Sequence, residues 1–300
     1  MNRAPDAWIS RRSLFQGRLF EIAHVICRPT PELRHEVTHA GLNVLALPTA
    51  GVFALHPGPR RHVVATQNHA VFISSGRHYR VTFPGCIGDE CLTLHLSPAG
   101  LARLAPHAMS RDGFDESTLF TRAVLPSSAI LARSLLMRAF VRDEADPLLV
   151  EELGIGLMDS ALGAVGAPRE MERARGSRHV ERVKEAISTS PERKWTLVEL
   201  AEMTGVSPCH LAHVFNRAVG TSVYRYAIRS RLAKALDAVL DSNLDLTTIA
   251  LDAGFASHSH FTARFRAFFG VTPDALRRSA RSGEAARLHK FVTARFAAAA

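Results

Sequence analysis

The first hundred residues contain short hydrophobic segments with the pattern of β-strands. These segments are rich in Val, Ile, Leu, Phe and Thr, and Gly or Pro residues separate them. Several short strands at regular spacing are typical of a sandwich or a small barrel. The expected strands are Leu19–Cys27, Leu42–Leu47, Val52–His56, Val63–Ala65, Ala70–Ser74, His78–Phe83 and Cys91–Leu96.

The hydrophobic period then changes from strand-like to helical. Apolar residues at helical spacing predict helices at Ser128–Val141 and Pro147–Val165. Residues 163–177 mix Gly, Ala, Pro and charged residues, which is typical of a linker. From there to about Arg281 the pattern stays helical. We therefore expect a first domain at 1–165, a linker at 166–178, a helical domain at 179–282 and a basic, alanine-rich tail at 283–300.

The helical region contains an internal repeat, in which Thr196–Val206 aligns with Asp245–Phe255. Each copy has the parts of a helix-turn-helix: a capping residue, a small alanine where two helices cross, and a glycine for the turn. These residues are Thr196, Ala201 and Gly205 in the first copy and Asp245, Ala250 and Gly254 in the second, and Glu199 completes a capping box with Thr196. A helix at Ser222–Leu240 is expected to connect the copies.

The second helix of each copy has an apolar face and a polar face. The residues expected to be buried are Leu211, Val214 and Phe215 in the first copy and Phe261, Phe265 and Phe268 in the second. A recognition helix reaches base edges in the major groove with its outward face, while arginines and capped helix N-termini hold phosphates. Two such helices about 34 Å apart would enter successive major grooves. The residues expected to contact DNA are Ser207, Cys209, His210, Ala212, His213 and Asn216 in the first copy and Ser257, His258, Ser259, Thr262, Ala263 and Arg266 in the second.

The distribution of charge supports a polyanionic partner for the helical region. The chain has a formal net charge of +9. Residues 171–300 hold 20 Lys and Arg against 12 Asp and Glu, whereas residues 1–170 hold 17 against 16. A basic domain next to a neutral one is a common feature of nucleic-acid-binding proteins.

Other features of the composition bear on where the protein works. Four cysteines are too few and too scattered for a disulfide scaffold, which favours a reducing cytoplasm. No apolar run approaches the ~20 residues of a membrane helix, so we expect no membrane partner. Ser10–Phe15 resembles a twin-arginine export signal, but Gln16, Gly17 and Arg18 interrupt the apolar stretch that such a signal needs. We expect a cytoplasmic protein.

Residues 178–280 resemble the AraC/XylS family of bacterial transcription regulators. The motifs that carry the likeness are Leu200-Ala201-x3-Gly205-Val206-Ser207, Leu211-x3-Phe215, Gly220-x5-Tyr226-x4-Arg231-Leu232, Ile249-Ala250-x3-Gly254-Phe255, Phe261-x3-Phe265, Phe268-x-Gly270 and Thr272-Pro273. The resemblance implies a domain whose two recognition helices read double-stranded DNA, usually as direct repeats, and that often activates transcription through RNA polymerase. The chain departs from the family pattern at Val223, where proline is usual, and at Ala212, where a polar base-reading residue is common.

The family resemblance of the first domain is looser. It implies a mainly β, cupin-like barrel with two following helices that binds a small-molecule effector and forms a homodimer. The expected fold class is therefore a two-domain protein with a cupin-like barrel and an all-α double helix-turn-helix. Its expected function is that of a sequence-specific transcriptional regulator, commonly an activator, with no enzymatic activity and no cofactor.

An alternative interpretation is a cupin-like metalloenzyme, or a metal or thiol sensor, whose helical domain is only structural. His35-Glu36-Val37-Thr38-His39 fits the zinc-protease motif H-E-x-x-H, which requires a helix, whereas β-branched Val37 and Thr38 lead into a strand. A cupin enzyme needs a His-x-His pair, and none occurs in the barrel region. Cys86 and Cys91, with Cys27, could form a thiol switch or a soft metal site, although buried, unreactive cysteines are commoner. We expect no metal site.

Overall fold

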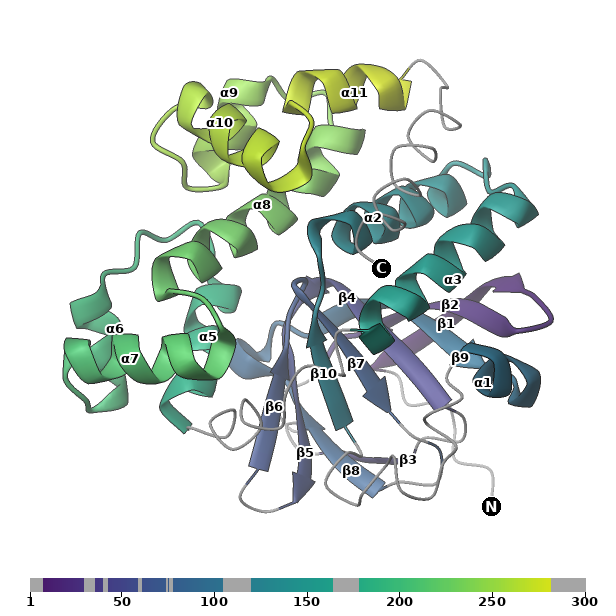
Figure 1. The fold of residues 1–300 in the computed structure, drawn as a ribbon, viewed down its shortest axis with the longest axis horizontal. Helices are drawn as coiled ribbons and strands as arrows, with labels where there is room; N and C mark the ends of the chain where they lie inside the picture. Colours follow the sequence, from purple (N-terminus) through teal and green to yellow (C-terminus); the bar gives the residue numbers. More distant parts are fainter. Residues whose placement is uncertain are drawn as a thin grey trace. The chain divides into compact units, whose positions relative to one another are not determined.

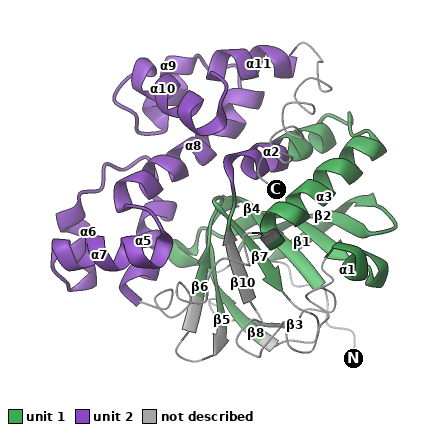
Figure 2. Cartoon of the chain, in the orientation of Figure 1, with its two compact units in different colours: residues 1–125, 135–166 green, residues 126–134, 167–300 purple. Residues whose placement is uncertain are grey.

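The computed structural model describes residues 8–29, 36–39, 43–58, 61–73, 75, 78–104, 120–163 and 178–281. The chain divides into two compact units (Figure 2). Residues 1–125 and 135–166 form the first unit, and residues 126–134 and 167–300 form the second. The predicted tail, residues 283–300, lies outside the described residues. The predicted linker, residues 166–178, also lies outside them except for Arg178, which is the first residue of a helix.

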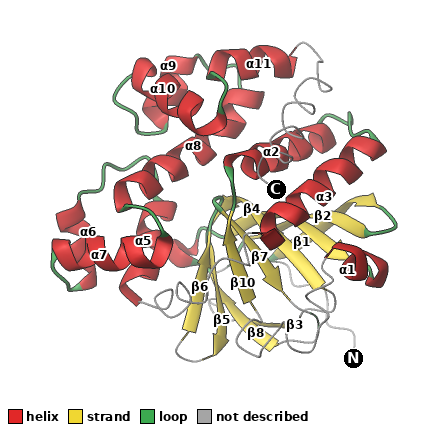
Figure 3. Ribbon diagram, viewed as in Figure 1, coloured by secondary structure: helices red, strands yellow, loops and turns green. Residues whose placement is uncertain are grey.

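The first unit contains two antiparallel sheets (Figures 1 and 3). The six-stranded sheet has the order β1-β2-β9-β4-β7-β10, and the four-stranded sheet has the order β3-β8-β5-β6. The strands are β1 (Ile9–Gln16), β2 (Phe20–Cys27), β3 (Glu36–His39), β4 (Asn43–Gly51), β5 (Phe53–Gly58), β6 (Arg61–Ala65), β7 (His69–Ile73), β8 (His78–Thr82), β9 (Asp89–Leu96) and β10 (Phe120–Val124).

Both sheets contribute side chains to one apolar core. Phe53 and Leu55 of β5 belong to the same cluster as Val71 of β7 and Cys91 of β9. Because strand side chains alternate between two faces, each sheet turns one apolar face toward this core. The described strands thus form two sheets that face each other, and closure into a barrel stays a prediction.

Helices cover part of the first unit. The helix α1 (Pro98–Leu104) follows β9, and α3 (Pro147–Gly163) also belongs to this unit, whereas α2 (Ser127–Val141) has residues 127–134 in the second unit and 135–141 in the first. Gly154 of α3 lies directly against the Phe20 ring of β2, and a Cβ atom at this position would overlap that ring. The lack of a side chain at Gly154 therefore lets α3 approach the sheet closely.

The seven strands and two helices predicted for this region are confirmed, whereas β1, β3, β10 and α1 were not predicted. The strand β1 was not predicted because it is an exposed edge strand without apolar alternation. It pairs with β2, and its Arg11 forms an ion pair of 2.7 Å with Glu21 of that strand. The segment that resembles an export signal is thus a paired strand. Glu36–His39 of the H-E-x-x-H sequence forms β3 rather than a helix, and His35 lies outside the described residues.

The second unit is helical. Its helices are α5 (Arg178–Thr189), α6 (Leu197–Thr204), α7 (Pro208–Val219), α8 (Val223–Asp241), α9 (Leu246–Asp252), α10 (His258–Phe269) and α11 (Pro273–Arg281). The predicted connecting helix is confirmed as α8, which contacts α5 and α7 as well as α9, α10 and α11. Figure 1 shows α6 and α7 beside one end of α8 and α9, α10 and α11 beside the other. None of the helices in the described ranges has both the length and the apolar character that crossing a bilayer requires.

Candidate nucleic-acid interface

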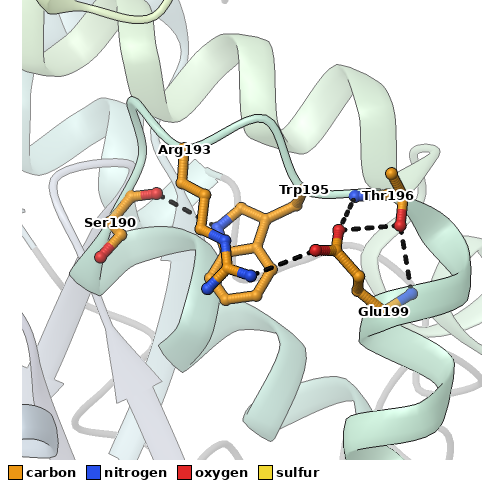
Figure 4. A network of polar contacts seen from close by, with 5 residues as sticks. All are labelled: Ser190, Arg193, Trp195, Thr196 and Glu199. Carbon is orange, nitrogen blue, oxygen red and sulfur yellow. Dashed lines mark hydrogen bonds and ion pairs between the residues drawn. The ribbon is translucent and has the colours of Figure 1, made fainter.

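A network of polar contacts fixes the start of α6 (Figure 4). The Thr196 amide donates to the Glu199 carboxylate at 2.7 Å, and the Glu199 amide donates to the Thr196 hydroxyl at 3.2 Å, which completes the predicted capping box. The guanidinium of Arg193 binds the same carboxylate at 3.1 Å and lies 4.0 Å from the centre of the Trp195 ring. The Trp195 indole donates to the Ser190 carbonyl at 3.1 Å.

The turn of the first helix-turn-helix forms as the sequence predicts. Gly205 ends α6 with a φ of 73°, a left-handed conformation that favours glycine. Ser207 then caps α7 by accepting a hydrogen bond from the His210 amide at 3.2 Å, and Pro208 occupies the first helical position.

The second copy repeats this local chemistry. Asp245 caps α9 by accepting hydrogen bonds from the amides of Thr247 and Thr248. Gly254 has a φ of 81° in the turn, and Ser257 caps α10 by accepting from the His260 amide at 3.1 Å. The sequence repeat is therefore a repeat of two helix-turn-helix units.

The buried faces of α7 and α10 agree with the prediction in four of six residues. Leu211, Phe215, Phe261 and Phe265 are buried, whereas Val214 and Phe268 are half-buried. Phe269 takes the fully buried position at the end of α10, and the Phe268 ring packs on it at 4.8 Å. The prediction failed at Phe268 because periodicity alone does not distinguish two consecutive phenylalanines at the last turn of a helix.

The structure gathers the predicted DNA-contacting residues on the outward faces of α7 and α10. Ala212 and Thr262 are half-buried, and the other ten residues are exposed: Ser207, Cys209, His210, His213, Asn216, Ser257, His258, Ser259, Ala263 and Arg266. The Thr262 hydroxyl lies 3.3 Å from Nε2 of His258, so these two side chains are held together. His260 instead packs edge-on against Phe255, at 5.5 Å between ring centres.

The helix caps give the four short helices of the repeat different charge at their N-termini. Hydrogen bonds from Thr196 hold the pKa of Glu199 below its usual range, and hydrogen bonds from Thr248 do the same for the pKa of Asp245. The helices α6 and α9 therefore begin with a carboxylate, whereas α7 and α10 begin with a serine hydroxyl and contain no acidic residue. Because a helix N-terminus carries a partial positive charge, α7 and α10 are the helices that can receive phosphate there.

Two exposed arginines adjoin this surface that the sequence analysis did not select. Arg217 follows Asn216 in the last turn of α7, and Arg264 lies on α10, where its Nε is 3.4 Å from Nε2 of His260. The signal that could have found Arg217 is its position on the polar side of α7, one residue after Asn216.

Other arginines of the basic region are structural. Arg231 is buried and donates to the carbonyls of Pro191 at 2.8 Å and Arg193 at 2.9 Å. Arg277 is also buried and donates to the Val239 carbonyl at 3.1 Å and the Leu244 carbonyl at 2.6 Å, beyond the end of α8. The positive charge available to a nucleic acid is therefore smaller than the composition suggests.

The sites considered for metal or thiol chemistry have a different character. Within the described ranges, no three His, Cys, Asp or Glu residues lie together in a group that could hold a metal ion. Burial and the nearby Asp89 raise the pKa of the Cys27 thiol, and Cys91 is buried. Since the thiolate is the reactive form of cysteine, this environment suppresses the reactivity of Cys27.

Comparison with known proteins identifies the helical region. A family described as a helix-turn-helix domain matches residues 200–279. The chain is 27% identical over 177 residues to the thermoregulatory protein LcrF of Yersinia pestis, covering 56% of this chain and 64% of that protein. It is 30% identical over 216 residues to the HTH-type transcriptional regulator GlxA of Rhizobium meliloti, covering 70% of this chain and 65% of that protein.

The chain spans less than two thirds of the length of both relatives. A solved structure of a probable AraC family transcriptional regulator from Rhodopseudomonas palustris is 31% identical, with a TM-score of 0.33 over 35% of this chain and 98% of that one. Two capped helix-turn-helix units, joined by α8 and matched by the family, are thus present. Residues 200–279 thus form a helix-turn-helix domain, and this part of the chain is similar to transcriptional regulators of the AraC type.

Proposed function

We propose that the chain is a sequence-specific transcriptional regulator that binds double-stranded DNA through α7 and α10. The observation that carries this proposal is the pair of exposed, acid-free helix faces on one scaffold, each with a neutral serine cap at its N-terminus. A helix of this size fits the major groove, and its first turn can approach phosphates. The names of the relatives LcrF and GlxA, a thermoregulatory protein and a transcriptional regulator, support the same function.

In this proposal, the two recognition helices have different tasks. The helix α10 presents the paired side chains His258 and Thr262, which can bond base edges, and Arg266, which can bond phosphate or guanine. The helix α7 presents His213 and Asn216 but has a half-buried alanine at the position equivalent to Thr262. We expect α10 to contribute more to sequence preference than α7.

The first experiment is selection of DNA from a random pool by the full chain, followed by binding measurements on the best site. Thr262→Ala and His258→Ala should each cost about 1–3 kcal/mol on that site and reduce the preference for one base pair. Retention of the full sequence preference by both variants would contradict the placement of α10 in the groove.

Arg266→Ala tests whether position rather than net charge governs binding. Its matched control is Arg278→Ala, which removes the same charge from an exposed arginine on α11 that pairs with Asp274 at 2.9 Å. Arg266→Ala should weaken binding several-fold more than Arg278→Ala, because only Arg266 lies on the outward face of α10. An equal effect of both substitutions would indicate unspecific attraction between the basic domain and DNA.

For the first unit, we propose a cupin-like sensor that binds a small-molecule effector and supports a homodimer, within domain boundaries of 1–165, 166–178 and 179–282. The support is an apolar core to which both antiparallel sheets contribute side chains. An effector that binds one conformation more tightly shifts the DNA-binding equilibrium by its differential affinity. Activation through RNA polymerase and a cytoplasmic location complete the proposal. Thermal-shift screening of the full chain should find a ligand that raises the unfolding temperature of the first unit.

A further inference from the structure

The turn between α5 and α6 contacts both helix-turn-helix units. We call residues 190–193 the bridging turn. On the side of the first helix-turn-helix unit, the bridging turn is held by the Trp195 indole, which donates to the Ser190 carbonyl at 3.1 Å, and by the ion pair between Arg193 and Glu199 at 3.1 Å (Figure 4). These contacts attach the bridging turn firmly to the start of α6.

Two side chains of α8 hold the bridging turn from another direction. The buried guanidinium of Arg231 donates through Nε to the Pro191 carbonyl at 2.8 Å and through a terminal nitrogen to the Arg193 carbonyl at 2.9 Å. One turn of helix later, the Lys234 ammonium binds the Glu192 carboxylate at 2.7 Å. The planar arginine fork fixes the directions of two carbonyls of the bridging turn, which a single flexible ammonium cannot do.

The second helix-turn-helix unit touches the same turn through Gly254. A Cβ atom at Gly254 would overlap the carbonyl oxygen of Glu192 and would lie 2.8 Å from its Cα atom. By contrast, nothing lies within 4 Å of the equivalent position at Gly205. Both glycines have a positive φ, 81° at Gly254 and 73° at Gly205, so the close approach is the feature that distinguishes them.

We propose that the bridging turn fixes the separation and orientation of α7 and α10, and thereby the spacing between the two DNA half-sites that the chain accepts; the DNA part of this inference rests on the proposed function. The helix α8 has 19 residues and is about 28 Å long, so α8 alone would leave the two helix-turn-helix units free to twist and bend about its ends. The bridging turn adds a second connection beside α8. Arg231, Lys234 and Gly254 are therefore positioning residues for recognition helices that they do not belong to.

The geometric part can be tested without DNA. Cys209 and Ser259 are exposed and occupy equivalent positions on α7 and α10. Spin labels on Cys209 and on Ser259→Cys, in the full chain with the half-buried Cys27 and Cys86 replaced by serine, report the distance between the two helices. The parent protein should give one narrow distribution of distances.

The substitutions are chosen so that a failure to fold does not decide the result. Gly254→Ala and Glu192→Lys should broaden or shift the distribution, whereas Gly205→Ala, the matched control, should leave it narrow. The double variant Glu192→Lys with Lys234→Glu, which swaps the two charges, should restore the narrow distribution. Because both side chains are partly exposed, these charge variants should fold, and they decide the result even if Gly254→Ala unfolds the protein. An unchanged narrow distribution in both Gly254→Ala and Glu192→Lys would overturn the proposal.

The DNA part uses the selected site and the same site with one base pair inserted between its halves. The parent should lose roughly tenfold or more in affinity on insertion, and Glu192→Lys less than about threefold, because a loosened pair of helices can follow the displaced half-site. A purely structural defect would lower the active fraction equally on both DNAs and leave the ratio unchanged, which would overturn the spacing role. Absence of binding to any selected DNA would overturn the proposed function instead, while the distances between the spin labels would still test the bridging turn.

Discussion

At the scale of the residue, equivalent positions of the repeat are not under equal constraint. The sequence predicts Gly205 and Gly254 for the same reason, a turn with positive φ, and the structure confirms this. It adds a tertiary constraint at Gly254, the backbone of Glu192, which no local pattern could indicate because the two residues lie far apart in the chain. Long-range contacts of this kind also explain why Arg231 and Arg277 could not be recognised as structural from their positive charge.

Alanine at the two glycines should therefore have very different effects on stability. Gly205→Ala should cost about 1–2 kcal/mol, the penalty of a left-handed conformation for a residue with a side chain. Gly254→Ala should cost roughly 1–3 kcal/mol more, because backbone must also move away from the new Cβ atom. Urea unfolding of the full chain, followed by Trp195 fluorescence in a Trp8→Phe background, measures both values. Equal losses of stability would mean that the Glu192 backbone yields freely.

At the scale of the element, local chemistry made the helix-turn-helix units predictable. Caps such as Thr196 with Glu199 act within four residues, so their sequence signature is complete, and the structure reproduces it. Edge elements lack such signatures. The strand β1 has mostly exposed residues on both faces and is fixed by pairing with β2, a partner that periodicity cannot reveal. The buried face of α7, with Leu211 and Phe215, was predictable, and with it the direction of the outward face. The contact of this outward face with DNA remains a prediction.

Cys209 offers a test of whether α7 enters the groove as well as α10. All four cysteines lie in described segments, and among them Cys209 is the exposed one, in the first turn of α7. A maleimide attached there should abolish high-affinity binding by steric overlap with DNA, and bound DNA should slow the labelling of Cys209. Cys209→Ser should bind DNA and resist inactivation. Full binding by the labelled protein would show that α7 stays outside the groove.

At the scale of the whole molecule, the first unit carries its own dependence on pH. Burial raises the pKa of Asp89 to about 6, although hydrogen bonds from the thiols of Cys91, at 3.0 Å, and Cys27 act to lower it. In the unfolded chain this carboxyl has a pKa of 3.8, so the folded state retains the proton up to a higher pH. The contribution of Asp89 to the free energy of unfolding is then largest below about pH 4 and falls as the pH rises to about 6, by roughly 3 kcal/mol in total.

Asp89→Asn should remove this dependence, because the amide keeps the size of the side chain and does not titrate. The two tryptophans separate the units: Trp8 belongs to the apolar cluster that contains Cys91, and Trp195 lies at the start of α6. In a Trp195→Phe background, the urea midpoint from Trp8 fluorescence should fall between pH 4 and 6.5 in the parent and change much less in Asp89→Asn. Glu151→Gln, which removes an exposed carboxyl from α3 of the same unit, serves as the control and should behave as the parent. If the urea midpoints of the parent and of Asp89→Asn instead depend on pH in the same way, the Asp89 carboxyl lies in water rather than in the core between the sheets.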